Sequence, residues 1–136
     1  MYGSGMEGIT ASVVTNLKCN NSIIKSCTYS IMTLDNCNGF EFNNCKFTDN
    51  QEFDLVNITN CIGVKFNNSE FSNNQTGTDE YSDYSLFNVS KSMSVELKDC
   101  TIENNSTVYF ANSSNSITIT NTKIENNAFE KGNFKQ

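Results

Sequence analysis

Apolar and polar residues alternate over short stretches of the chain, and five of these stretches follow one template. The template reads apolar, polar, apolar, polar, Asn or Asp, small, variable, apolar. Alternation with a period of two places the apolar side chains on one face of an extended strand and the polar ones on the other. The five copies span residues 17–24, 40–47, 64–71, 95–102 and 117–124.

The spacing of the copies indicates a repeat. They begin about 23 residues apart, with one longer interval before residue 95. A second apolar segment precedes each copy at the same spacing, at residues 9–11, 32–34, 56–58, 87–89 and 109–111. Periods of roughly 20 to 50 residues are typical of solenoids. The sequence therefore predicts an all-β fold, a right-handed parallel β-helix (solenoid) of about five coils with three short strands per coil.

Stacking of the coils would bury the apolar positions. No coil can bury its own apolar face, but in a stack like residues lie over like residues about 4.7 to 4.9 Å apart and share one core. We expect coils over residues 8–127 and a C-terminal cap over residues 128–136, in a single domain that is either complete or a fragment of a larger protein. The predicted inward residues are Leu17, Cys19, Ile24, Phe40, Phe42, Phe47, Val64, Phe66, Phe71, Val95, Leu97, Ile102, Ile117, Ile119 and Ile124.

Two columns of asparagine recur at the coil spacing. The first is expected at a bend between two strands, where a short amide side chain tolerates a left-handed backbone and bonds its neighbours in an asparagine ladder. The second is expected to close the third strand in the same way. The first column is Asn21, Asn44, Asn68, Asp99 and Asn121, and the second is Asn50, Asn74, Asn105 and Asn127 with Cys27 at its start. We interpret both columns as structural.

The six cysteines fit the repeat better than they fit a metal site. There is no Cys-x-x-Cys pair and no histidine, which makes a zinc site improbable. Several cysteines occupy small-residue columns, in which a free thiol acts as a small apolar group. Cys37 and Cys61 hold equivalent places on consecutive coils, where a disulfide is sterically conceivable. We nevertheless expect free thiols, and we expect the buried ones to be unreactive.

Composition narrows the range of functions. The 136 residues carry 9 Lys+Arg against 15 Asp+Glu, a formal net charge of -6 that disfavours nucleic acid as a partner. Arginine and histidine are absent, which removes most of the side chains used for proton transfer near neutral pH. Neither an apolar run of membrane-spanning length nor a signal-peptide pattern is present, so we expect no membrane partner. We expect a bacterial envelope or extracellular location if the chain belongs to a larger protein, and a cytoplasmic one if it is complete.

The repeating units resemble those of right-handed β-helix proteins of the pectate-lyase-like superfamily. The unit at residues 39–50, Gly-Phe-Glu-Phe-Asn-Asn-Cys-Lys-Phe-Thr-Asp-Asn, carries this resemblance, which covers about residues 8–127. Residues 2–9 and 27–32 also look like stretches in β-helix proteins of low-GC Gram-positive bacteria. Lyases of this fold use an Arg or Lys base beside calcium-binding carboxylates, and its hydrolases pair Asp residues with His. Because Arg and His are missing here, the resemblance implies the fold and not an enzyme.

One loop departs from the repeat and offers the best candidate site. Residues 75–85 carry three acids and two tyrosines, and they are expected beside two acids of the preceding coil. Carboxylates gathered on one rim suit calcium, the one cofactor we consider, and tyrosine rings can stack on sugars. The alternative is a solvated acidic insertion. The candidate ligand-binding residues are Glu52, Asp54, Asp79, Glu80, Tyr81, Asp83 and Tyr84.

The ends of a solenoid expose unpaired strand edges. Phe129 and Phe134 are expected to fold over the last coil as a lid, and the N-terminal coil edge is expected to pack against an upstream domain or a second copy of the chain. The leading hypothesis is a non-catalytic structural or interaction module of a bacterial envelope or phage-related protein. The alternative is a carbohydrate-binding or degenerate polysaccharide-active domain that uses residues 75–85. The expected partners are therefore a carbohydrate or another protein.

Overall fold

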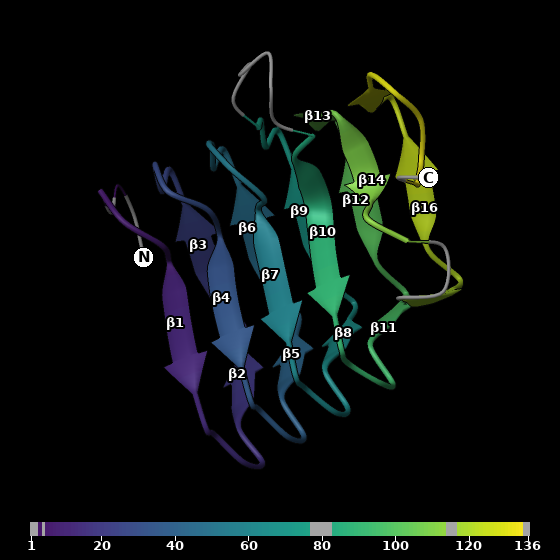
Figure 1. Cartoon of the computed structure of the whole chain (residues 1–136). Helices are drawn as coiled ribbons and strands as arrows, with labels where there is room; N and C mark the ends of the chain where they lie inside the picture. The colour runs from purple at the N-terminus through teal and green to yellow at the C-terminus, as the bar shows by residue number, and fades with distance from the viewer. Residues whose placement is uncertain (1–2, 4, 77–82, 114–116, 135–136) are drawn as a thin grey trace.

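The computed structural model describes residues 3, 5–76, 83–113 and 117–134. In these residues the fold is all-β, a right-handed parallel β-helix of about five coils, which confirms the predicted fold class. Each coil contributes one strand to each of three parallel sheets (Figure 1). No helix in the described residues is long and apolar enough to cross a membrane.

The three sheets run along the stack, and each pairs the equivalent strands of consecutive coils. The first sheet contains β1 (Ile9–Ser12), β4 (Met32–Asp35), β7 (Val56–Thr59), β10 (Ser85–Ser90) and β14 (Tyr109–Ala111). The second contains β2 (Lys18–Asn20), β5 (Glu41–Asn43), β8 (Lys65–Asn67), β11 (Glu96–Lys98) and β15 (Thr118–Thr120). The third contains β3 (Ile23–Lys25), β6 (Lys46–Thr48), β9 (Glu70–Ser72), β12 (Thr101–Glu103) and β16 (Lys123–Glu125).

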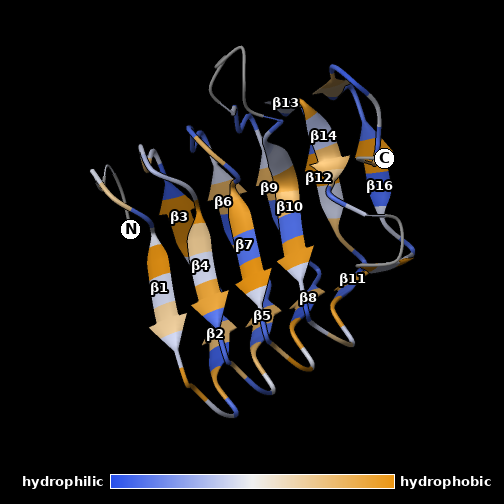
Figure 2. Cartoon of the chain, in the orientation of Figure 1, coloured by the Kyte–Doolittle hydropathy of each residue, from blue (hydrophilic) through white to orange (hydrophobic). Residues whose placement is uncertain are grey.

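The core forms where the three sheets face one another. Phe42 pairs in register with Phe66, and Phe66 with Leu97, so the predicted single file of inward residues is confirmed. The rings of Phe42 and Phe66 stack with centroids 4.8 Å apart, and those of Phe47 and Phe71 with centroids 4.7 Å apart. Figure 2 shows the underlying alternation of apolar and polar residues along β7 and β10.

The terminal coils are less buried than predicted. Leu17, Ile119 and Ile124 were expected to point into the core, but their side chains are 40%, 38% and 41% exposed. They lie in the first and last coils, which have a neighbouring coil on one side only. Because burial in a solenoid depends on a neighbour at both sides, alternation alone overstates the core at its ends.

The C-terminal segment adds a partial extra layer to the last coil. β17 (Ala128–Phe129) pairs with β13 (Ser106–Thr107), and Phe134 forms a bridge to β14. The ring centroids of Phe129 and Phe134 lie 5.5 and 6.2 Å from that of Phe110. This lid (residues 128–134) therefore covers the side of the first sheet, and β15 and β16 remain the outermost strands of the other two.

The first asparagine column forms the expected bend between the second and third strands of each coil. Its five residues have φ angles between 44° and 54°, in the left-handed region. Asn68 Nδ2 donates to Asn44 Oδ1, and Asn121 Nδ2 donates to Asp99 Oδ1, each over 2.6 Å. Both contacts join equivalent residues of consecutive coils at the solvent-exposed surface. The structure therefore confirms an asparagine ladder at this corner.

The second asparagine column differs from the expectation. The left-handed residues at that corner are the ones immediately before it, namely Ser26, Asp49, Asn73, Asn104 and Asn126. The residue that follows a left-handed bend turns its side chain toward the interior, and Asn50, Asn74 and Asn105 are each 1% exposed. This column is therefore a buried ladder rather than a surface bend.

Asn74 shows how the buried ladder satisfies its polar groups. Its Oδ1 accepts hydrogen bonds from the backbone N–H of Asn50 over 3.0 Å and from Asn50 Nδ2 over 3.1 Å. Its Nδ2 donates to Asn105 Oδ1 and to the backbone C=O of Phe47, both over 2.9 Å. Asn127 Oδ1 likewise accepts hydrogen bonds from the backbone N–H and from Nδ2 of Asn105. Each amide thus joins three coils while every donor and acceptor finds a partner.

At the other corners, side chains of cysteine, serine and threonine accept hydrogen bonds from the backbone N–H groups of the preceding coil. The backbone N–H of Cys45 donates to Ser69 Oγ over 3.1 Å, and that of Cys37 donates to Cys61 Sγ over 3.4 Å. All six cysteines are free thiols, as expected, and Cys37 and Cys61 meet through this hydrogen bond rather than a disulfide. The corner columns hold five of the six, namely Cys27, Cys37, Cys45, Cys61 and Cys100.

Replacing Phe66 with Ala should lower the free energy of unfolding by about 3 to 5 kcal/mol, because the ring is fully buried among other phenylalanines. Glu41→Ala should cost less than about 1 kcal/mol, since Glu41 forms only a surface ion pair with Lys18 at 3.4 Å. Urea unfolding followed by circular dichroism measures both values. Equal losses in the two variants would contradict the stacked core.

Replacing Asn74 with Ala should lower the free energy of unfolding by about 2 to 5 kcal/mol, because the buried backbone N–H of Asn50 loses its acceptor. The matched control is Asn67→Ala, which removes a hydrogen bond of 2.9 Å to Asn43 on the outer face. That loss should be about 1 kcal/mol or less. Thermal and urea unfolding of both variants tests the difference, and an equally mild effect of Asn74→Ala would show that the buried ladder is dispensable.

Candidate functional site

Three aromatic rings lie in a row along the rim formed by the loops that lead from the third sheet back to the first. They belong to Tyr29, Phe53 and Tyr84, in three consecutive coils. The centroids of Tyr29 and Phe53 are 4.6 Å apart, and those of Phe53 and Tyr84 are 5.6 Å apart. Tyr29 is 43% exposed and Phe53 is 38% exposed. This aromatic row presents ring surface to solvent on an otherwise polar rim.

The sheet beneath the rim fixes the spacing of the row. Three first-sheet residues pair in register, namely Met32, Val56 and Phe87. Each aromatic residue of the row precedes one of them by three residues in the sequence. Left-handed φ angles of 72° at Glu52 and 55° at Phe53 form the tight turn that carries the central ring. The rings therefore keep the interval of the coils and do not depend on a long loop for their positions.

Sequence reasoning found only one end of the row. Tyr84 was a candidate residue, whereas Tyr29 and Phe53 were missed. A signal was present, since the three rings recur at the same intervals as the first-sheet strands that follow them. Their positions lie outside the alternating template, and that is why the repeat did not draw attention to them.

Two of the predicted rim acids, Asp54 and Asp83, form hydrogen bonds within the scaffold. Asp54 accepts a hydrogen bond from the backbone N–H of Ser85 at Oδ1 over 2.7 Å, and one from Asn88 Nδ2 at Oδ2 over 3.2 Å. It thereby connects the loop before β7 to the start of β10. Asp83 accepts a hydrogen bond from Lys131 Nζ over 2.6 Å and so ties the lid to the rim. This contact raises the pKa of the Lys131 ammonium group.

The remaining predicted residues divide into two groups. Glu52 lies exposed beside Phe53, and its backbone N–H donates to the C=O of Gln75 over 3.0 Å. Asp79, Glu80 and Tyr81 lie outside the described residues. Within residues 3, 5–76, 83–113 and 117–134, no three Asp, Glu or Cys side chains come together as a metal site. Calcium binding at the rim stays a prediction.

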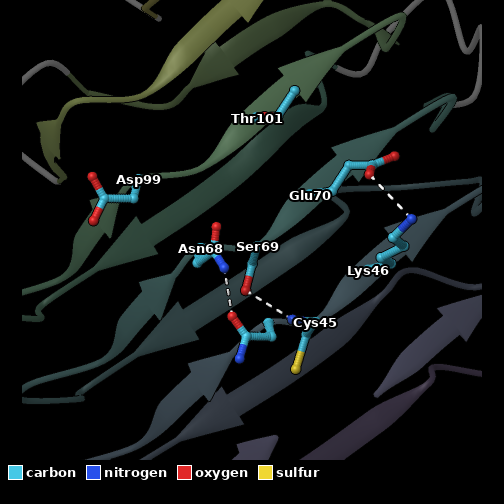
Figure 3. Close-up of a pocket in the computed structure, with 8 residues that line it drawn as sticks. Cys45, Lys46, Asn68, Ser69, Glu70, Asp99 and Thr101 are labelled. Carbon is cyan, nitrogen blue, oxygen red and sulfur yellow. Dashed lines mark hydrogen bonds and ion pairs between the residues drawn. The ribbon is translucent and has the colours of Figure 1, made fainter. Parts of the chain in front are cut away.

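A concave feature lies at the corner between the second and third sheets. It is a groove of about 330 Å³ lined by Asn44, Cys45, Lys46, Asn68, Ser69, Glu70, Asp99 and Thr101. Two pairs of its side chains contact each other (Figure 3). Lys46 Nζ lies 3.6 Å from Glu70 Oε2, and Asn68 Nδ2 donates to Asn44 Oδ1. The groove is therefore polar, shallow and lined by ladder contacts, which makes it a weaker candidate than the rim.

The thiols are poorly suited to covalent chemistry. Burial raises the pKa of the thiols of Cys45, Cys61 and Cys100, although hydrogen bonds with the backbone oppose this effect in part. A raised thiol pKa keeps the sulfur protonated near neutral pH, and the protonated form is a weak nucleophile. These cysteines lie in the corner columns.

No known protein family and no curated protein matches the sequence. The arrangement of the described side chains must therefore indicate what the surface can do. Its most distinctive exposed feature is a set of aromatic rings at fixed intervals beside polar groups, which suits binding of a partner with flat apolar faces and hydroxyl groups.

The free energy of unfolding should fall at alkaline pH in a way that depends on Cys100. Burial raises the pKa of this thiol in the folded state, whereas in the unfolded chain it ionises near its ordinary pKa of about 9.0. The stabilising contribution is therefore complete below that pH and is lost as the pH rises through the folded-state value.

Urea unfolding from pH 7 to pH 10 under reducing conditions should show a smaller alkaline loss for Cys100→Ser than for the wild type. Ser is the natural control because Ser69 occupies the same column one coil earlier and keeps its hydrogen bonds. Parallel pH profiles for the two proteins would contradict this role for the thiol.

Proposed function

We propose that the chain is a non-catalytic structural or interaction module. What supports the proposal most directly is that the scaffold itself uses the side chains that could carry chemistry. Asp54 connects two coils at the rim, Asp83 holds the lid through Lys131, and the corner cysteines are buried ladder groups. Among the described residues, every buried side-chain nitrogen and oxygen has a hydrogen-bond partner. An unsatisfied buried polar side chain, which often indicates an active site, is not found in this part of the chain.

One observation favours a second candidate, a carbohydrate-binding or degenerate polysaccharide-active domain. The aromatic row places Tyr29, Phe53 and Tyr84 along one rim at intervals set by the coils. Sugar rings have flat apolar faces that stack on aromatic side chains, and their hydroxyl groups can bond to the polar side chains around the row. An extended glycan lying across the coils would contact the rings in succession.

The wider setting is also part of the proposal. Units such as residues 39–50, which contain β5 and β6, support kinship with the pectate-lyase-like superfamily and, together with the sequence of residues 2–9 and 27–32, a bacterial origin. We propose a role in a bacterial envelope or phage-related protein, with a carbohydrate or another protein as partner. The net charge of -6 disfavours nucleic acid.

The carbohydrate function predicts binding to at least one polysaccharide-derived ligand on a glycan array, and loss of about tenfold in affinity in Phe53→Ala. The central ring contacts both of its neighbours, so its removal interrupts the stacking surface. Met93→Ala is the matched control, because Met93 is 64% exposed but lies at another corner of the coil.

Two further measurements separate the candidates. Calcium titration followed by melting temperature tests the rim acids, and a shift that is absent in Asp54→Asn would assign the ion to this rim. Assays for new reducing ends or unsaturated products from acidic polysaccharides test catalysis, and we expect none. Turnover would overturn the non-catalytic proposal, whereas an array without binders and a constant melting temperature would remove the carbohydrate function alone.

A further inference from the structure

The C-terminal end of the stack exposes two strand edges with apolar residues. β15 and β16 are the last strands of their sheets, and all of their residues are exposed. Ile119 and Ile124 hold the positions that Phe66 and Phe71 fill two coils earlier, where exposure is 0%. Figure 1 shows β16 at this end of the stack. An apolar edge strand of this kind readily pairs with another strand.

We propose that two copies of the chain associate through this end, with β16 of one copy pairing antiparallel to β16 of the other about a twofold axis at Ile124. This partner is a second copy of the same chain, and the inference is independent of carbohydrate binding at the rim. The N-terminal edge, which was expected to pack against an upstream domain or a second copy, fits self-association less well for reasons of charge given below.

The hydrogen-bond pattern of β16 suits this axis. The backbone N–H of Lys123 donates to the C=O of Cys100, toward the coil below. Because N–H and C=O groups alternate in direction along a strand, those of Ile124 are directed to the open edge. Two copies of Ile124 placed opposite each other can therefore exchange both hydrogen bonds, as the paired residues of an antiparallel ladder do.

Charge selects the antiparallel register centred on Ile124. In that register Lys123 lies opposite Glu125 of the second copy, and Glu125 lies opposite its Lys123. Both side chains are exposed, at 59% and 43%, and are 2.7 Å apart within one copy. A parallel in-register pairing would instead place lysine against lysine and glutamate against glutamate, and like charges directly opposite each other are destabilising.

The edges at the other end lack this complementarity. Antiparallel self-pairing of β3 would place Ile23 opposite Lys25, and that of β2 would place Lys18 opposite Asn20. The backbone N–H of Gly3 also donates to the C=O of Lys25 over 2.9 Å, so part of the β3 edge is already paired. Self-recognition by opposite charges is thus a property of β16 and not of β2 or β3.

The shape of the C-terminal end also suits a twofold axis. Phe134 of the lid adds a layer over β14, on one side of β16, whereas β15 on the other side of β16 has no such layer among the described residues. A twofold rotation perpendicular to β16 brings the raised side of each copy over the lower side of the other. The lid of one copy then covers Ile119 of its partner, and the two stepped surfaces are complementary.

Sedimentation equilibrium at low ionic strength tests the proposal in variants that reverse the charges at residues 123 and 125. The wild type should dimerise with rising concentration, and Lys123→Glu and Glu125→Lys should each weaken the dimer by about tenfold or more. The double variant Lys123→Glu/Glu125→Lys should restore the wild-type dissociation constant, and an equimolar mixture of the two single variants should form a mixed dimer.

Two controls keep the outcome specific. Lys46→Glu reverses a charge in the same sheet away from its open edge and should leave dimerisation unchanged. Circular dichroism should confirm that each variant is folded, and the mixed dimer provides a second readout if one variant is less stable. A wild type that stays monomeric at all concentrations, a dimer indifferent to single charge reversal, or a double variant that does not recover would each overturn the proposal.

Discussion

The backbone N–H at each inner corner of the coil is the group on which the whole stack depends. Between two strands the chain must turn, and a buried amide that leaves the sheet still needs an acceptor. Here the next coil supplies it from a side chain, as Asn74 Oδ1 does for Asn50 and Ser69 Oγ does for Cys45. A coil therefore cannot complete its own corners, and the free energy of the fold resides in contacts between neighbours.

The need for an acceptor at each corner explains two features of the composition, the number of cysteines and the absence of proline. The corner positions need a small inward side chain that accepts a hydrogen bond, and Asn, Ser, Thr and Cys all meet that need. Five of the six free cysteines then follow from the fold, since they fill corner columns. The absence of proline fits the same constraint, because a residue without an N–H cannot donate a hydrogen bond to a ladder.

The fold could be predicted because its two determinants, alternation and coil spacing, are both visible along the chain. The ladders were only partly predictable: Asn73 and Asn74 are adjacent and chemically identical, yet one adopts the left-handed bend and the other points inward. Spacing cannot distinguish them, since the difference arises from the corner and not from the residue type. The site was predicted at one end only, because Tyr29 packs against Phe53 and Phe53 against Tyr84 at positions that lie outside the alternating template. The exposure of the first and last coils was also not predicted, because it results from having a neighbouring coil on one side only.

The same constraint indicates where binding can occur. Corner groups and inward side chains are occupied by contacts between coils, so the rim and the ends carry the surface that the stack does not use. Because the intervals of the aromatic row are set by paired strands beneath it, the rings are ordered before a ligand arrives, which lowers the entropic cost of binding. A twofold dimer through β16 would place two such rows on one particle. A polymer long enough to reach both would then bind the second row at a raised effective concentration, which would give a gain in affinity without any new contact.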